Sequence, residues 1–370
     1  MGHVRRRKLE GGGTAYLARY RGPDGRERSK QFAKRSDAER FLSVAEVTKA
    51  EGSWVDPARG RMCLRDWLVR FQESERRALR PSTLARDEVY VRTQILPAFG
   101  DVALARIEHQ AIQTWVNELA ERLAPTTVHK CHQILRKTLA GAVRSRLLVR
   151  NPCDEVQLPR VHLDEMRFIG PAEIRLLAGT IDTRYHAFVL LGAYSGLRLG
   201  EMAGLRWRRV DLERGRVEVA EISVEINGSI NFGPPKTKAG RRVVAVPDLV
   251  VASLRATRPS NADQDDLVFR APGGGPIRHR LFRRRFWYPA VAQAGLDGFR
   301  IHDLRHTAVA LWIAAGASPT EVAQRAGHTS VVTVLDRYGH LLPQAADAVT
   351  QRLNQIATAG EIDQPVAWGR

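Results

Sequence analysis

Apolar residues recur at helical spacing through most of this 370-residue chain and change to an alternating, strand-like spacing in two short stretches. A repeat of three or four residues places apolar side chains on one face of a helix, whereas alternation places them on one face of a strand. Alternation occurs around residues 16–32 and again between residues 208 and 246. The pattern predicts a mainly α fold with small β-sheets, spread over more than one domain because of the length of the chain.

Changes of period and clusters of proline and glycine predict three blocks followed by a tail. The first block spans residues 1–55, the second spans residues 61–158 and is helical, and the third spans residues 165–358 and mixes helices with strands. The segment 154–164 is expected to be an exposed linker. Docking on a neighbouring subunit and disorder are both open for the tail, residues 359–370.

The first block predicts a small sheet backed by one helix. Alternating residues indicate strands at 16–21 and 29–32, with a turn between them at Pro23–Gly25. The pattern Ser36–Glu39 is a capping box, which predicts that a helix starts there. A basic run, Arg5–Lys8, precedes the first of these strands.

The second block predicts four helices. The first opens at Leu64–Phe71, and the second begins at Pro81 and ends before Pro97, because proline disrupts the interior of a helix. Apolar residues at helical spacing mark the third helix at 112–119 and the fourth at 126–147.

The charge balance points to a polyanionic partner. The chain has 58 lysines and arginines against 40 acidic residues, a formal net charge of +18. Charge alone does not separate DNA from RNA or from an acidic membrane surface. No apolar run is long enough to span a membrane and no signal peptide is evident, so a cytoplasmic protein is expected. Three widely spaced cysteines favour a reduced compartment and no metal site.

The third block carries an ordered series of arginine, histidine and tyrosine motifs. The series runs Gly196-Leu197-Arg198-Leu199-Gly200-Glu201, His302-Asp303-Leu304-Arg305-His306, Gly327-His328 and Tyr338-Gly339-His340. Each motif alone has an ordinary explanation, such as a surface ion pair or a histidine at a helix end. Together they supply two arginines, several histidines and one late tyrosine, the groups that attack on a phosphodiester by a phenol requires.

That chemistry explains the residue types. Fixed arginines meet the charge that builds on the phosphate oxygens, because a guanidinium is always protonated and its planar fork matches two oxygens. Arg198 and Arg305 are the candidates. A tyrosine hydroxyl has a pKa near ~10, so Tyr338 must lose a proton as it attacks, and the departing oxygen must gain one. The site therefore needs a base and an acid within hydrogen-bond reach.

Two of the histidines are expected at the ends of helices. If the segment after His302 is helical, Arg305 lies on the same face three residues later. A cap at Ser318 and a glycine stop predict a short helix, after which His328 emerges. A rival interpretation pairs His302 with His306 as metal ligands, but Arg305 between them would repel a cation.

In order and spacing these motifs resemble the tyrosine recombinases, the family that includes the phage integrases. The resemblance implies that Tyr338 forms a 3′-phosphotyrosyl link and frees a 5′ hydroxyl, with no metal, cofactor or ATP. Phosphate-binding and acid–base roles are implied for Arg198, His302, Arg305 and His328. Glu201 either supports these groups or forms a surface ion pair, and the two interpretations are nearly even.

The resemblance also implies an acid-acting lysine just before the third strand of the catalytic sheet. Strand-like patterns occur at 210–212, 216–219 and 242–246. Lys236, in a Pro-Lys-Thr sequence, matches the acid best, and Lys238 is a close alternative.

Beyond the catalytic motifs, the resemblance implies an arm-type DNA-binding domain in the first block and a core-binding domain in the second, followed by the catalytic domain. The expected further contacts with DNA are Arg5, Arg6, Arg7, Arg19, Arg280 and Arg284. The implied partners are double-stranded attachment sites, three further copies in a synaptic homotetramer, a host DNA-bending protein and an excision factor. The implied location is the cytoplasm of a bacterial host, at the nucleoid.

The function implied is site-specific recombination that integrates or excises a mobile element. Two other classes stay open, namely a non-catalytic DNA-binding regulator and a topoisomerase-like enzyme that reseals a single duplex. The intact nucleophile, Tyr338, disfavours the first. The basic N-terminal block disfavours the second, because it suggests a second class of DNA site.

Overall fold

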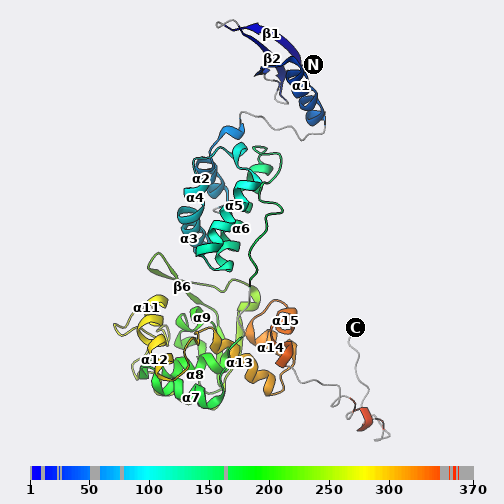
Figure 1. The fold of residues 1–370 in the computed structure, drawn as a ribbon. Helices are drawn as coiled ribbons and strands as arrows, with labels where there is room; N and C mark the ends of the chain where they lie inside the picture. The colour runs from blue at the N-terminus through cyan, green and yellow to red at the C-terminus, as the bar shows by residue number, and fades with distance from the viewer. Residues whose placement is uncertain are drawn as a thin grey trace. The chain divides into compact units, whose positions relative to one another are not determined.

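The structure is a computed structural model that describes residues 2–9, 13–22, 25, 27–50, 59–75, 79–161, 166–341, 350, 353–355 and 357. The chain separates into two compact units, Met1–Leu163 and Asp164–Arg370 (Figure 1). The fold is mainly helical with small antiparallel sheets, which confirms the predicted class. The predicted tail, residues 359–370, lies outside the described residues, and the division into three blocks stays a prediction.

The first unit begins with a three-stranded antiparallel sheet backed by one helix (Figure 1). The elements are β1 (His3–Lys8), β2 (Thr14–Arg21), β3 (Glu27–Phe32) and α1 (Arg35–Ala50), with the strands in sequence order. The apolar cluster that joins the sheet to the helix is centred on Ala18, Tyr20, Ala38 and Leu42. Two of the three strands are predicted by alternation. The third, β1, is the basic run, whose charges hide its strand pattern.

Helix α1 begins two residues earlier than the sequence predicts. The capping-box pattern makes Ser36 the cap, outside the helix, but the helix starts at Arg35. Glu39 accepts a hydrogen bond from Arg35 Nε at 2.8 Å, so an ion pair of residues four apart occupies the first turn. The capping box at Ser36 is therefore wrong.

The remaining described helices of the first unit surround one apolar core. They are α2 (Leu64–Glu75), α3 (Pro81–Tyr90), the π-helical segment η2 (Val91–Ile95), α4 (Leu96–Phe99), α5 (His109–Arg122) and α6 (Pro125–Arg144), with short 3-10 turns η1 (Arg59–Arg61) and η3 (Leu104–Arg106). Fully buried residues of this core include Leu64, Ile95, Ile112, Leu119 and Leu135.

The second predicted helix does not end before Pro97. Helical backbone continues from α3 through η2 and α4 to Phe99. Pro97 lies in the first turn of α4, where a missing backbone N–H costs little, and the π-helical segment before it changes the hydrogen-bond register. The predicted boundary at Pro97 is therefore wrong.

The second unit combines helices with two small antiparallel sheets. Its strands are β4 (Val210–Asp211), β5 (Arg216–Val219), β6 (Ile222–Ile226), β7 (Ser229–Gly233) and β8 (Arg242–Ala245), which form the sheets β4-β5-β8 and β6-β7. Its α-helices are α7 (Pro171–Thr180), α8 (His186–Ser195), α9 (Leu199–Ala203), α10 (Asp248–Thr257), α11 (His279–Phe282), α12 (Tyr288–Gln293), α13 (Asp303–Ala314), α14 (Pro319–Ala326) and α15 (Val332–Tyr338). Its shorter or irregular turns are η4 (Thr183–Tyr185), η5 (Trp207–Arg209), η6 (Lys238–Gly240), the π-helical η7 (Arg283–Trp287) and η8 (Gly339–Leu341).

The three predicted strands of the catalytic sheet are present as β4, β5 and β8. The β6–β7 hairpin is an addition that the sequence reasoning missed. Its turn is Asn227–Gly228, with φ angles of 49° and 79°. An Asn-Gly pair between alternating apolar residues is a strong hairpin signal, so the hairpin could have been predicted.

Helix α8 lies at the centre of the core of the second unit and contacts α7, α10 and α13. A Cβ atom on Gly192 would lie 2.8 Å from Leu304 Cδ1, so the glycine allows α8 and α13 to approach closely. Because Arg198 follows α8 and Arg305 lies on α13, this packing brings the two candidate arginines into one region. Across the described residues, no helix has the length and apolar character needed to cross a membrane.

Candidate active site

Arg198 is positioned by a left-handed turn between α8 and α9. Gly196 ends α8 with φ of 63°, a conformation that glycine adopts without strain. A Cβ atom there would also lie 2.8 Å from Cη2 of Trp312. The turn places Arg198 at the start of α9, with 40% of its side chain exposed.

Glu201 is buried between two arginines. Its carboxylate accepts hydrogen bonds from the backbone N–H and Nη1 of Arg198, at 2.9 and 2.8 Å, and from Nη1 and Nη2 of Arg242, at 3.2 and 2.9 Å. Burial alone would raise the pKa of this carboxyl, but the hydrogen bonds and charge of Arg242, together with Arg198, lower it. Glu201 thus belongs to a buried ion cluster and not to a surface ion pair.

Glu201→Gln is expected to lower the free energy of unfolding by roughly 3–5 kcal/mol, because it leaves the buried Arg242 without its counter-charge. The side chains of Glu201 and Arg242 are only 3% and 6% exposed. Urea denaturation measures the change. Glu213→Gln is the matched control, because Glu213 pairs with Arg255 at an exposed position, where a loss below about 1 kcal/mol is expected. Equal losses in the two variants would contradict the buried role.

The same contacts set a pH dependence for stability. The pKa of Glu201 is lower in the folded protein than in the unfolded chain, so its contribution is fully present above the unfolded value of about 4.3. The contribution is lost as the pH falls through the folded pKa.

Arg305 extends from α13 into the interior of the unit and is only 3% exposed. Its Nη1 donates to the carbonyl of Gly196 at 2.7 Å, and its Nη2 donates to the carbonyl of Ala326 at 2.5 Å. Burial, followed by the charges of Arg198 and Arg242, lowers the pKa of Arg305 to about 9. The guanidinium therefore stays protonated at neutral pH and is held in place by the backbone on two sides.

Helix α14 positions His328 as the sequence predicts. Ser318 caps the helix by accepting a hydrogen bond from the backbone N–H of Glu321 at 3.3 Å, and Gly327 ends it with φ of 66°. His328 follows directly and is half-buried. A Cβ atom on Gly327 would lie 2.8 Å from the carbonyl oxygen of Ala239, so the glycine also lets the end of α14 approach η6.

One ring nitrogen of His328 takes part in a hydrogen bond, and the other has no hydrogen-bond partner among the described residues. Its Nε2 accepts a hydrogen bond from Arg305 Nη2 at 2.9 Å. Because arginine can only donate, the neutral ring carries its proton on Nδ1, which is buried without a partner among the described residues. Burial and the charges of Arg305 and Arg198 lower the pKa of His328 to about 4. A buried N–H donor beside two cations suits an anionic oxygen.

Arg198, Glu201, Lys236 and His328 line one cavity of about 390 Å³. Lys236 lies in the connection between β7 and η6, and Gly327 and Thr333 also line the cavity. Lys238 lies in η6 and is not among the residues that line the cavity. Of the two candidate acids, Lys236 is therefore the one that shares a cavity with Arg198 and His328.

Tyr338 ends α15, and only 1% of it is exposed. Its hydroxyl lies 2.6 Å from Nδ1 of His306, which is on α13. Burial raises the pKa of Tyr338, and the charges of Arg305 and Arg337 oppose that rise. Tyr338 is not among the residues that line the cavity.

His302 lies at the N-cap position of α13 and makes no side-chain cap bond. Its side chain is exposed, whereas Arg305 is buried. The pKa of His302 is lowered to about 4. The main cause is partial burial of the ring, and the charges of His306, Arg305 and Arg198 act in the same direction. The ring lies edge-to-face with that of His306, with 5.0 Å between centroids. The described residues hold no group of three or more side chains arranged to bind a metal.

Two residues of this site were missed or misassigned at the level of sequence. Arg242 opens β8, and its Nε donates to the carbonyl of Arg325 at 2.6 Å, so it connects β8 to α14 as well as to Glu201. Its position at the start of a predicted strand carried no signal. For His306 the sequence suggests only the rival role of a metal ligand, whereas the structure places it in contact with Tyr338, the candidate nucleophile.

The arginines expected to contact DNA occur in both units. Exposed arginines on and beside α11 and η7 are Arg278, Arg280, Arg283, Arg284 and Arg285. In the N-terminal sheet, Arg5 pairs with Leu17 and Arg6 pairs with Tyr16. Since alternate residues face opposite sides, Arg5, Arg7 and Arg19 share the face away from α1, and Arg6 lies on the other face.

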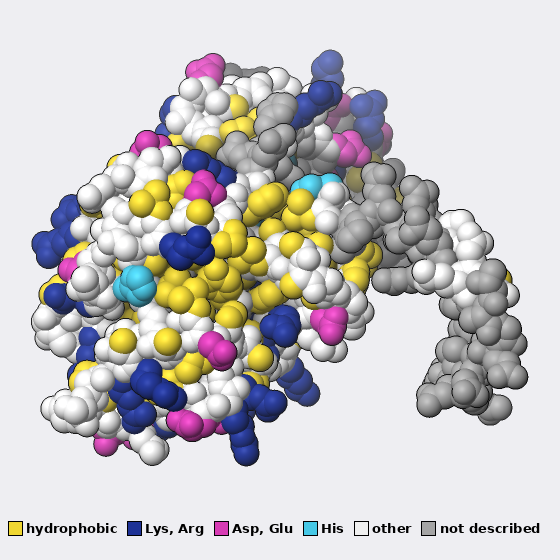
Figure 2. Space-filling model, turned by 90° about the horizontal axis from the view of Figure 1, so that it is seen from below, with side chains coloured by type: hydrophobic (Ala, Val, Ile, Leu, Met, Phe, Trp, Pro, Cys, Tyr) yellow, Lys and Arg dark blue, Asp and Glu magenta, His cyan; other side chains and the backbone are white. Residues whose placement is uncertain are grey.

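Figure 2 shows one face of the molecule on which Lys and Arg side chains occur among Asp, Glu and hydrophobic side chains. The positive charge on that face is therefore divided into small groups and does not form one continuous basic surface.

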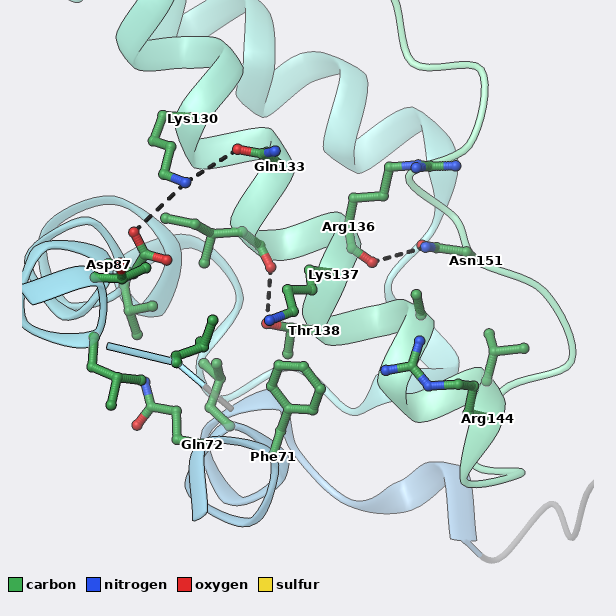
Figure 3. A pocket seen from close by; sticks show the side chains of 18 of the residues that line it. Phe71, Gln72, Asp87, Lys130, Gln133, Arg136, Lys137, Thr138, Arg144 and Asn151 are labelled. Carbon is green, nitrogen blue, oxygen red and sulfur yellow. Dashed lines mark hydrogen bonds and ion pairs between the residues drawn. The ribbon is translucent and has the colours of Figure 1, made fainter. Parts of the chain in front are cut away.

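A larger cavity, of about 660 Å³, lies in the first unit between α2, α3 and α6 (Figure 3). Phe71 is among the residues that line it, and Lys130 bonds to Gln133 at 3.1 Å and pairs with Asp87 at 3.7 Å. None of the catalytic candidates lines this cavity. Size alone therefore does not locate the phosphate chemistry, which needs the cationic groups of the second unit.

Comparison with known proteins identifies relatives of this chain. Residues 167–345 match the phage integrase family, and residues 63–120 match the N-terminal SAM-like domain of phage integrases. The prophage phiRv2 integrase of Mycobacterium tuberculosis is 27% identical to this chain over 94% of each protein.

Solved structures share the fold. The integrase of the Tn1549 transposon, in complex with a circular intermediate DNA, matches with a TM-score of 0.67 and 18% identity over 79% of this chain and 99% of that chain. A lambda integrase tetramer bound to a Holliday junction matches with a TM-score of 0.56 and 15% identity over 85% of this chain and 90% of that chain. The two matched segments, the near full-length relative and the shared fold establish that the chain belongs to the phage integrase family of tyrosine recombinases.

Proposed function

We propose that this chain is a site-specific DNA integrase that cleaves and rejoins DNA through a 3′-phosphotyrosyl intermediate, and so integrates or excises a mobile element. The observation that carries the assignment of roles is the cavity shared by Arg198, Lys236 and His328, with Arg305 bonded to His328. Cationic side chains and an unpaired imidazole N–H there offer several donors to a single phosphate group.

In the proposed reaction, the hydroxyl oxygen of Tyr338 attacks the scissile phosphorus, its proton passes to a base of the site, and the bond to the 5′ oxygen breaks. Arg198 and Arg305 offset the charge on the phosphate oxygens, and the Nδ1–H of His328 donates to one of them. Lys236 supplies the proton that the 5′ oxygen gains. Attack on the phosphotyrosyl bond by the 5′ hydroxyl of a partner strand reverses these transfers and restores DNA.

Two further residues complete the proposed site. Glu201 holds Arg198 and Arg242 in position through its hydrogen bonds to both. His302, which lies exposed beside His306, acts as an acid or base in the proton transfers of the reaction. Arginine and lysine side chains supply the positive charge needed at the phosphate, and each broken bond is stored as a phosphotyrosine, so neither a metal nor ATP takes part.

The proposed partners follow from charge and from the relatives. A formal net charge of +18 supports binding to double-stranded attachment sites. The lambda integrase that shares this fold forms a tetramer on a Holliday junction, which supports a homotetramer on two duplexes. A host DNA-bending protein, an excision factor and activity at the bacterial nucleoid belong to the same proposal.

A suicide duplex, nicked so that the cleaved end diffuses away, tests the reaction. The expected result is a covalent protein–DNA adduct that survives denaturation and forms in EDTA. Transfer of strands between two duplexes is then expected, which separates recombination from topoisomerase-like resealing of one duplex. Absence of any adduct, or a requirement for a divalent metal, would contradict the proposed chemistry.

Deletion of residues 1–55 is expected to leave cleavage of a core site intact and to impair recombination that needs distant arm sites. The reason is that this segment holds none of the catalytic candidates and presents Arg5, Arg7 and Arg19 on one face of a separate small sheet. Suicide-substrate cleavage and arm-site gel shifts measure the two effects. A full-length Arg5→Ala, Arg7→Ala, Arg19→Ala variant is the matched comparison. Loss of core-site cleavage in the truncated protein would show that the segment is needed to bind or cleave the core site.

A further inference from the structure

His306 and Tyr338 form a contact that the proposed roles of the other residues do not use. His306 lies one turn into α13 and is 5% exposed, and Tyr338 ends α15 and is 1% exposed. The distance of 2.6 Å between Nδ1 of His306 and the hydroxyl oxygen of Tyr338 is that of a short hydrogen bond. The hydroxyl concerned is the atom that attacks DNA.

The direction of this hydrogen bond follows from the protonation of the two groups. Burial raises the pKa of Tyr338, so the phenol keeps its proton at neutral pH. Burial also lowers the pKa of His306, so the imidazole is neutral. The phenol therefore donates and Nδ1 accepts, which places the proton of His306 on Nε2.

The other candidate bases are occupied or differently placed. Nε2 of His328 already accepts a hydrogen bond from Arg305, and its Nδ1 is a donor. His302 is exposed, and its ring lies edge-to-face with that of His306, which is the residue bonded to Tyr338. Among the described residues, Nδ1 of His306 is the single hydrogen-bond acceptor found on the Tyr338 hydroxyl.

We propose that His306 is a catalytic residue, which holds the hydroxyl of Tyr338 and takes its proton as the oxygen attacks the scissile phosphate. The inference rests on the proposed function. In this step the O–H bond of Tyr338 breaks, its proton moves to Nδ1 of His306, a bond from the tyrosine oxygen to phosphorus forms, and the bond to the 5′ oxygen breaks. Lys236 protonates that 5′ oxygen, so protons and charge balance. His306 returns its proton when the 5′ hydroxyl of the partner strand releases Tyr338.

The surroundings of His306 are consistent with a base that gains a proton only briefly. The ionisable groups that act on it or contact it are Tyr338, His302, Asp303, Arg300, Arg305 and Arg337. Asp303 favours the protonated ring, and the arginines oppose it. The carboxylate of Asp303 is held by the backbone N–H and side chain of Arg300, at 2.7 and 3.0 Å, so it is not itself placed to take the phenolic proton.

His306→Asn is the decisive variant, because an asparagine oxygen can replace Nδ1 as an acceptor but cannot take the proton. Single-turnover formation of the covalent adduct on a suicide duplex is expected to slow by roughly 10²–10⁴-fold, the range for loss of a general base. DNA binding in a gel shift and the thermal unfolding midpoint are expected to stay close to wild type. His306→Gln is the second variant should the first unfold. His340→Asn, at an exposed position two residues from Tyr338, is the matched control and is expected to cleave normally.

A substrate with a 5′-thiol leaving group distinguishes the role of His306 as a base from the role of the general acid. Sulfur departs without a proton, so this substrate is expected to leave the His306→Asn deficit unchanged. Rescue of that deficit by the thiol would place His306 on the leaving group and overturn the proposal. Wild-type cleavage rates in folded His306→Asn or His306→Gln would also overturn it.

A measurement independent of cleavage tests the contact itself. The chain has seven tyrosines, and the ¹³Cζ resonance of Tyr338 is the one absent from Tyr338→Phe. In the wild type this resonance is expected to shift as His306 titrates, and the inflection is expected to vanish in His306→Asn. An unchanged titration would contradict the contact. Absence of an adduct in the wild type would instead contradict the proposed function, so the two failures are distinct.

Discussion

Tyr338→Phe is expected to bind DNA as the wild type does and to form no covalent adduct. The substitution removes only the attacking oxygen, while the buried ring keeps its contacts with the core around α13 and α14. The measurement is a denaturing gel of the suicide-substrate reaction beside a gel shift at the same protein concentration. Loss of the hydrogen bond to His306 is expected to lower the free energy of unfolding by about 1 kcal/mol.

Tyr288→Phe is a suitable control, because Tyr288 is exposed at the start of α12. It is expected to cleave at the wild-type rate. An adduct that persists in the Tyr338→Phe protein would move the nucleophile to another residue. Loss of DNA binding in that variant would show that the hydroxyl is needed for the assembly of the site and not only for attack.

Lys236→Ala is expected to slow cleavage by roughly 10²–10⁴-fold, the usual range for loss of a general acid. Lys236 lines the cavity with Arg198 and His328, where it can reach an oxygen that leaves the phosphate. The deficit is expected to shrink on a 5′-thiol substrate, because sulfur leaves without protonation. Single-turnover rates on the two substrates measure the effect.

Lys238→Ala distinguishes the two lysines. A larger deficit in Lys238→Ala than in Lys236→Ala, again relieved by the thiol, would transfer the acid role to Lys238. Equal slowing of Lys236→Ala on both substrates would show that Lys236 acts on the phosphate charge and does not transfer a proton.

The sequence was most informative where a local rule determines the backbone. The helix at Pro319–Ala326 has its cap, its proline and its glycine stop in the predicted places, because each of these residues acts through its own turn. The same holds for Gly196, whose left-handed turn places Arg198. Family resemblance then added the roles, which local patterns do not carry.

The sequence was least informative where contacts join distant segments. Arg242 meets Glu201 across 41 positions, and Tyr338 meets His306 across 32. No periodicity links such pairs, since their distance is set by the packing of whole elements. The continuation of helical backbone through Pro97 was missed for a related reason. The π-helical segment before Pro97 changes the backbone hydrogen-bond register, so the proline does not interrupt the helix there.

The cluster around Glu201 has a thermodynamic consequence for the free protein. Arg198, Arg242 and Arg305 gather in one region, and one carboxylate, that of Glu201, is hydrogen-bonded to the first two. Positive charge there exceeds its counter-charge, and the resulting mutual repulsion destabilises the native state. A phosphodiester that binds among these groups supplies the missing negative charge. Binding of such a group and folding of the second unit are thus thermodynamically linked, and relief of the repulsion among the arginines contributes to the affinity for the bound phosphate.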